Sequence, residues 1–167
     1  MAGRPLRRLR EALMNSGKLP SSGSPKSAAI RWARTGPYTK LYAGPSLRAA
    51  DLQDADLFNG CFGGIDLTEV DLSGANIENT DFAKSKMNDA IFVAAWANSA
   101  DFTEAQLRNA DFTSTSLYFA SFRGADCRNA NFKSALLRDA DFTGADLRGA
   151  RFDPEARSHA IFTGAKF

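Results

Sequence analysis

The sequence predicts an all-β coil with four sides, and three observations support this prediction. Large apolar residues recur at every fifth position from residue 47 to residue 167, with no insertion or deletion. The same residue types return every 20 positions, and a small residue usually stands two places before each large one. Only Ala97 and Arg157 interrupt the series. Its members are Leu47, Leu52, Leu57, Phe62, Leu67, Leu72, Ile77, Phe82, Met87, Phe92, Phe102, Leu107, Phe112, Leu117, Phe122, Cys127, Phe132, Leu137, Phe142, Leu147, Phe152, Phe162 and Phe167.

A period of five suits neither a regular helix nor a flat strand. On an α-helix five residues advance by about 500°, so successive apolar side chains drift around the cylinder. On a flat strand every second one of them would point to water. All of them point to one axis if the chain turns by about 90° after each unit of five. Four such sides then close one coil, which explains the 20-residue period.

The 20-residue period appears as columns that stacked coils would bring together. Phenylalanine fills one column throughout, at positions 62, 82, 102, 122, 142 and 162. A second column holds leucine twice and then phenylalanine four times, at positions 52, 72, 92, 112, 132 and 152. Paired strands lie about 4.8 Å apart, so about six coils make a rod on the order of 30 Å long.

Two other positions of the five-residue unit hold short side chains. Alanine fills 17 of the 25 places two residues before the large apolar one, which fills a narrow interior without overpacking. Asp or Asn often stands between the two, as in Ala145-Asp146-Leu147. We interpret these polar side chains as partners for backbone groups near the corners rather than as catalytic groups.

Alanine, then Asp or Asn, then Leu or Phe, then two variable residues is the signature of the pentapeptide repeat. The chain resembles the pentapeptide-repeat family from residue 42 or 47 to residue 167. The resemblance implies a right-handed quadrilateral parallel β-helix. It also implies a mostly non-enzymatic family, in which some members resemble duplex DNA and bind type II topoisomerases. Others are cyanobacterial, plastid or secreted-effector proteins.

Charge divides the chain into a basic N-terminal extension, residues 1–40, and the repeat domain, residues 41–167. The extension holds nine Lys or Arg and one acid, Glu11, for a net charge of +8, whereas the repeat domain holds 12 basic and 18 acidic residues, for −6. In the extension we expect a short amphipathic helix over 4–14, a Ser/Gly/Pro linker over 15–29 and an apolar cap over 30–42.

The basic extension has three interpretations: an arm that holds a partner or nucleic acid, an organelle transit peptide, or a solvated extension. We do not expect a secretory signal, because no apolar core follows the arginines, nor a membrane span, because no run approaches about 20 apolar residues. The expected location is a reducing compartment, cytoplasmic, or a plastid or mitochondrion if residues 1–40 are a transit peptide.

Catalytic and metal-binding constellations are not evident in the residues, so we expect no enzyme activity, no cofactor and no metal. His159 is the one histidine and stands apart from any cysteine cluster. Cys127 takes a core position, while Cys61 stands at a polar position on another side, about three coils away. The two are therefore too far apart for a disulfide, and unpaired cysteines suit a reducing compartment.

Two groups of outward residues are candidate partner-binding sites. The first is apolar and falls on one side of the coil; its members are Phe58, Trp96, Tyr118, Phe119 and Leu136. Such a composition is typical of a protein-binding hot spot. For Trp96 the alternative is that its ring swings inward to fill the space beside Ala97.

The second group is a column of arginines, one per coil: Arg108, Arg128 and Arg148. Asp126 and Asp146 stand two positions before the last two of them. The column is therefore either a ladder of salt bridges or a stripe that binds an anion such as phosphate.

Together these features predict a non-enzymatic scaffold for protein–protein interaction, or an assembly subunit. One alternative is a DNA-mimicking type II topoisomerase (gyrase) binder; another is an organelle-targeted subunit of a larger complex. The coil ends in register at Phe167, so we also expect this end to dock against a second copy or another protein. A nucleic-acid partner is not expected.

Overall fold

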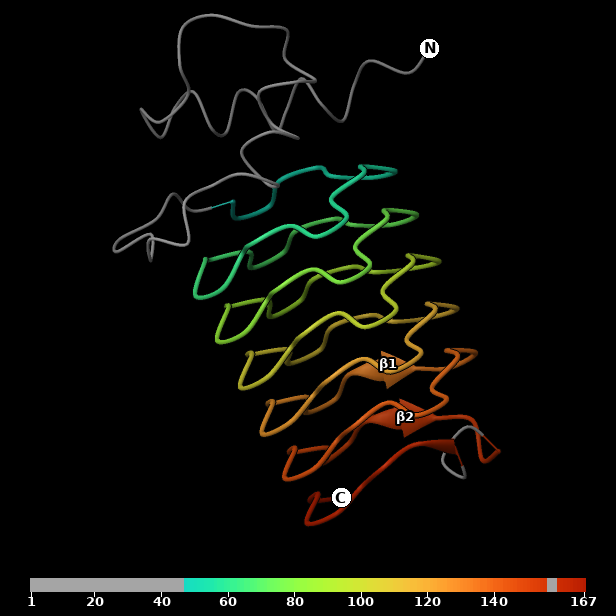
Figure 1. Ribbon diagram of the computed structural model, residues 1–167. Coiled ribbons are helices and arrows are strands. Elements are labelled where there is room, and N and C mark those ends of the chain that lie inside the picture. The colour runs from blue at the N-terminus through green and yellow to red at the C-terminus, as the bar shows by residue number, and fades with distance from the viewer. Residues whose placement is uncertain (1–46, 156–158) are drawn as a thin grey trace, which may run out of the picture.

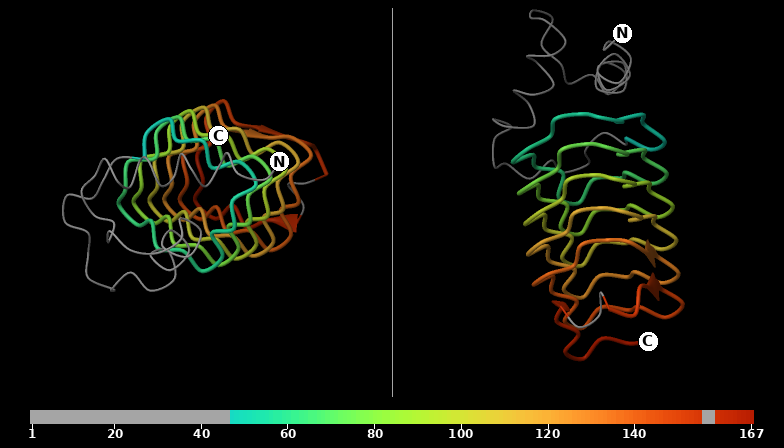
Figure 2. Two further views of the ribbon diagram at one scale, coloured as in Figure 1. Left: turned by 90° about the horizontal axis from the view of Figure 1, so that it is seen from above. Right: turned by 90° about the vertical axis from the view of Figure 1, so that its right-hand side faces the viewer.

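The computed structural model describes residues 47–155 and 159–167, which form a rod of stacked four-sided coils (Figure 1). The chain winds as a right-handed quadrilateral parallel β-helix, as predicted. Seen along the rod in Figure 2, successive coils repeat one outline with a small offset. The helix, linker and cap expected in residues 4–42, as well as Arg157, lie outside the described residues.

Neighbouring coils are held together by parallel backbone pairing in which residue n meets residue n+20. Strand β1 (Asn131–Phe132) pairs with strand β2 (Arg151–Phe152) in this register. The other coils are joined by single bridges of the same register, such as Asp71 with Ile91 and Trp96 with Ser116. Strands are this short because each side ends at a corner after five residues. The pairing confirms the predicted period of 20.

Each corner is a tight turn that begins at the large inward residue. In the first of them, Ala50 N donates to Leu47 O at 3.0 Å, and Ala49, the third residue, has φ 52°. This combination is that of a type II turn. Among the described residues 16 corners hold a non-glycine residue at positive φ and six hold glycine. Most corners therefore carry backbone strain that the pairing between coils must offset.

The Asp and Asn side chains beside the corners accept hydrogen bonds from the backbone two residues later. Asp111 Oδ1 accepts from Thr113 N at 2.9 Å, and Asp141 Oδ1 accepts from Thr143 N at 2.8 Å. The Asp and Asn side chains therefore act as partners for backbone groups near the corners, as predicted.

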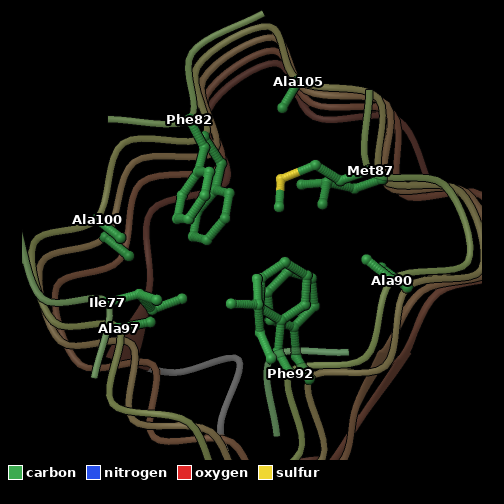
Figure 3. Packing of buried hydrophobic residues seen from close by; sticks show 14 of the residues in the cluster. Ile77, Phe82, Met87, Ala90, Phe92, Ala97, Ala100 and Ala105 are labelled. Carbon is green, nitrogen blue, oxygen red and sulfur yellow. The ribbon is translucent and has the colours of Figure 1, made fainter. Parts of the chain in front are cut away.

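The interior is filled by two columns of phenylalanine on opposite sides of the coil (Figure 3). Successive rings in a column are stacked with centroids 4.4–5.4 Å apart, from Phe92–Phe112 to Phe62–Phe82. Rings of the two columns meet edge to face across the axis, for example Phe92 and Phe102 at 5.6 Å. Alanines fill the corners of the square, so the core is apolar and continuous.

The four sides are named by their inward residues. Side A carries residue 47 and every twentieth residue after it; sides B, C and D begin likewise at residues 52, 57 and 62. Side A therefore faces away from side C, and side B from side D. In Figure 3 Met87 of side A lies across the interior from Ile77 and Ala97 of side C.

Within the described residues, the repeat becomes irregular between Asp153 and His159. Asp153 Oδ2 accepts from Ser134 N at 2.7 Å, and Asp139 N donates to His159 O at 2.7 Å, one residue beyond the n+19 partner found at the other corners. The bridge between Asp141 and Ile161 restores the register of 20. The last coil is less well covered than the others, since Phe152 and Phe162 are only partly buried and Phe167 is 57% exposed.

Candidate interaction surface on side C

Side C carries a group of exposed apolar side chains. Trp96, Phe119 and Leu136 are 62%, 63% and 49% exposed, and Tyr118 is half-buried between them. We call these four residues the aromatic face. The inward alternative for Trp96 is wrong. Trp96 N donates to Ala75 O at 2.9 Å in the coil-to-coil register, so its side chain points outward, while Ala97 takes the buried place.

The aromatic face is built on a rigid base. Trp96 and Leu136 stand in one column with Ser116 between them, two coils or about 10 Å apart. Asn98 Oδ1 accepts from Ser116 Oγ at 2.7 Å and from Tyr118 N at 3.1 Å. These bonds fix the Ser116 side chain and the backbone of Tyr118 in place.

Phe119 is held in an unfavourable backbone conformation. Its φ is 60°, in the left-handed region that bulky L-residues avoid at a cost of roughly 1–2 kcal/mol. The same corner holds Asn59, Asn79, Ser99 and Asp139 in other coils, and Asn and Asp tolerate the conformation best. A large exposed aromatic at this corner is thus not explained by folding.

A cavity of about 250 Å³ opens beside the aromatic face, where the repeat is interrupted. Its lining includes Tyr118, Leu136 and Leu137 as well as the polar residues Arg138, Glu155 and His159. His159 Nδ1 lies 3.2 Å from the backbone oxygen of Glu155. This cavity was not predicted from the sequence, although the irregular sequence from Asp153 to Ala160 marks its place in the chain.

Phe58 lies on side C but apart from the aromatic face. It is half-buried, and Glu78 and Asn98 occupy its column in the two coils between Phe58 and Tyr118. The structure therefore separates Phe58 from the other four predicted residues.

The arginine column lies on side A, which faces away from the aromatic face, and its members are paired. Arg108 Nε lies 2.7 Å from Asp126 Oδ2, and Arg128 Nε lies 2.8 Å from Asp126 Oδ1. Arg148 Nη2 lies 2.6 Å from Asp146 Oδ2. The hydrogen bond from Arg128, with further help from Arg108, lowers the pKa of Asp126 to about 2. The structure has the salt-bridge ladder; anion binding by these arginines stays a prediction.

The two cysteines are both free. Burial raises the pKa of the Cys127 thiol, and partial burial together with the Asp81 carboxylate raises that of Cys61, so both are protonated at neutral pH. Over residues 47–155 and 159–167 no three His, Cys, Asp or Glu side chains gather as a metal site would require. In the same part of the chain there is no helix of the length and hydropathy of a membrane span.

Fold and surface together define a class: a β-solenoid of five-residue units with an exposed apolar side. A family model described as pentapeptide repeat region matches residues 65–142. This part of the chain is a pentapeptide repeat region, as its sequence pattern predicted. No curated protein sequence matches it.

Several solved structures are similar to this chain, among them two of pentapeptide repeat proteins. One from the thylakoid lumen of Arabidopsis thaliana is 29% identical, with 62% of each chain covered and a TM-score of 0.33. The match thus spans less than two thirds of that protein. Rfr23 from the cyanobacterium Cyanothece 51142 is 24% identical over 58% of this chain and 67% of its own, with a TM-score of 0.35. QnrB1, a plasmid-mediated fluoroquinolone resistance protein, is 19% identical over 70% of this chain and 78% of its own, also with a TM-score of 0.35.

Proposed function

We propose that this chain is a non-enzymatic protein-interaction module that contacts its partner through the aromatic face of side C. The observation that carries the proposal is the contiguous exposure of Trp96, Phe119 and Leu136 on a rigid coil. Tryptophan and tyrosine are enriched where binding energy concentrates, and a rigid base reduces the entropy lost on binding.

Two further features support this assignment. Phe119 is kept at positive φ, and such strain persists at functional sites where other structure offsets it. The adjacent cavity is large enough to receive one apolar side chain of a partner, and Arg138 in its lining offers a polar contact. Arg108, Arg128 and Arg148 do not belong to this surface, because they lie on the opposite side.

The topoisomerase alternative would need negative charge along much of the rod. Residues 41–99 hold nine acidic and three basic residues, but residues 100–167 hold nine of each. A DNA-like charge pattern is thus confined to the first half, which favours the interaction module.

A site-specific photo-crosslinker tests the proposal. A benzophenone amino acid is placed at Phe119 and, as a matched control, at Asn109, an exposed corner of side A in the same stack with φ 59°. After irradiation in extract of the source cells, the proposal expects a discrete protein adduct from position 119 and none from position 109. The adduct should disappear when Trp96→Ser and Leu136→Ser are added. Adducts from position 109 alone, or an adduct at 119 that survives both changes, would contradict the proposal.

A further inference from the structure

Sides B and C of the first two coils carry negative charge only. Residues 50–59 and 70–79 contain five acids and no lysine or arginine. We call these five residues the acidic face: Asp51, Asp54, Asp56, Asp71 and Glu78. Bridges between Asp51 and Asp71 and between Asp56 and Asn76 place them in adjacent coils, and Asp54 and Asp56 are exposed.

Two carboxylates of this face, Asp71 and Glu78, accept hydrogen bonds from neighbouring side chains. Asp71 accepts from Gln53 and from Ser73, and Glu78 accepts from Asn98 Nδ2 at 2.6 Å. These donors are neutral, so they leave the charges of Asp71 and Glu78 in place. Asp51 and Asp71 follow one another in a column at about the spacing of paired strands, where like charges repel. A cationic segment lying over the face would relieve this repulsion.

The same two sides become apolar in the third coil. Residues 90–99 carry no charge and include Ile91, Val93 and Trp96, of which Ile91 is 38% and Trp96 62% exposed. One continuous surface therefore offers carboxylates first and apolar side chains next. Its complement is a segment that has cations and large apolar residues close together.

The chain itself contains such a segment immediately before the rod. Residues 1–40 have a net charge of +8, and within them arginines alternate with Leu6, Leu9 and Leu13. The segment joins the described rod at Leu47, on side A just before side B, and thus next to the acidic face. Its length, at up to about 3.3–3.6 Å per residue, far exceeds the roughly 30 Å of the rod. Linkage in one chain raises the effective concentration to the millimolar range.

We propose that the basic segment of residues 1–40 docks on sides B and C of its own rod. Its arginines contact the acidic face, and its leucines contact Ile91 and Trp96. This inference does not rest on the proposed function, but it adds a consequence: the docked segment overlaps the aromatic face and competes with a protein partner there.

Paramagnetic broadening in the full-length chain tests the docking. A nitroxide is attached at Ala2→Cys in a Cys61→Ser background; Cys127 is buried and stays unlabelled. The docking predicts loss of amide signal by about twofold or more at Ser73, Glu78 and Trp96, relative to Arg108 and Asn109 on side A. The difference should vanish near 1 M NaCl, where the Debye length is about 3 Å.

Charge reversal provides the matched variants. Arg7→Glu, Arg8→Glu and Arg10→Glu together should abolish the broadening, and adding Asp51→Lys, Asp54→Lys and Asp56→Lys should restore it. Equal broadening of sides A, B and C, or no restoration in the charge-swapped chain, would overturn the inference. So would broadening in a mixture where the nitroxide and the isotope label are on different chains, because the docked segment would then belong to a second copy.

Discussion

Among single residues, Phe119 is the clearest case of an exposed side chain whose backbone conformation costs stability. The residue is 63% exposed and held at φ 60°. Phe119→Asn should leave the free energy of unfolding unchanged or raise it by up to about 1 kcal/mol, because Asn tolerates the left-handed conformation. Urea unfolding measures this, with the buried Phe122→Ala as the control that should lose about 3–5 kcal/mol. A loss above about 1 kcal/mol in Phe119→Asn would mean that the ring stabilises the fold.

Asp126 makes stability depend on pH. Its pKa in the folded chain is about 2, below the ordinary 3.8, because Arg128 and Arg108 stabilise the carboxylate. The stabilisation is therefore present above about pH 4 and lost as pH falls towards 2. Because the guanidinium groups of Arg128 and Arg108 are exposed, this stabilisation amounts to up to about 1 kcal/mol. Asp126→Asn should thus be less stable than the natural chain at pH 7 and equal to it at pH 2.

Urea midpoints at pH 7, 4 and 2 measure this difference. Asp101→Asn is the control, since Asp101 accepts from Thr103 N at 2.8 Å and forms no ion pair within the described part of the chain. A constant difference between Asp126→Asn and the natural chain at all three pH values would show that the ion pairs contribute nothing.

The residues of side C also show which structural features a sequence pattern can predict and which it cannot. Exposure of Trp96 and Leu136 follows from their place beside an inward residue, so the spacing of five predicts it. The strain at Phe119 and the cavity beside Leu137 depend on backbone dihedrals and on the path after Asp153. Neither is encoded in hydrophobic spacing, which is why the sequence pointed to the residues but not to the concave site.

For the repeating unit, the phenylalanine columns should dominate the energetics. Phe112 stacks on Phe92 at 4.4 Å and on Phe132 at 4.9 Å, and meets Phe102 and Phe122 edge to face. Phe112→Ala should cost about 3–5 kcal/mol through lost burial and a cavity. Phe112→Leu should cost about 1–2 kcal/mol, since it keeps most of the volume but loses the ring contacts. Equal losses for the two variants in urea unfolding would contradict a specific contribution from aromatic stacking.

The unit also explains why the fold was predictable while its strands were not. The large inward residues, their small neighbours and the Asp or Asn beside each corner all recur every five residues. The pairing of residue n with residue n+20 confirms this register, and the hydrogen bond from Thr113 N to Asp111 confirms the role of the Asp and Asn side chains. Pairing long enough to count as a strand occurs only at β1 and β2 within the described residues. Corners every five residues interrupt the ladder elsewhere, and a sequence pattern does not reveal such small differences in backbone geometry.

In the molecule as a whole, each coil contacts only the coils before and after it, so stability should vary along the rod. Central residues such as Phe102 and Leu117 are completely buried, whereas Phe152 and Phe162 are partly exposed. Hydrogen exchange should therefore be about tenfold or more faster over residues 159–167 than over residues 92–132, because the last coil opens at a lower free energy. Phe162→Ala should speed exchange in the last coil and leave residues 92–132 unchanged. If Phe162→Ala instead speeds exchange equally along the rod, the solenoid unfolds as one cooperative unit rather than coil by coil.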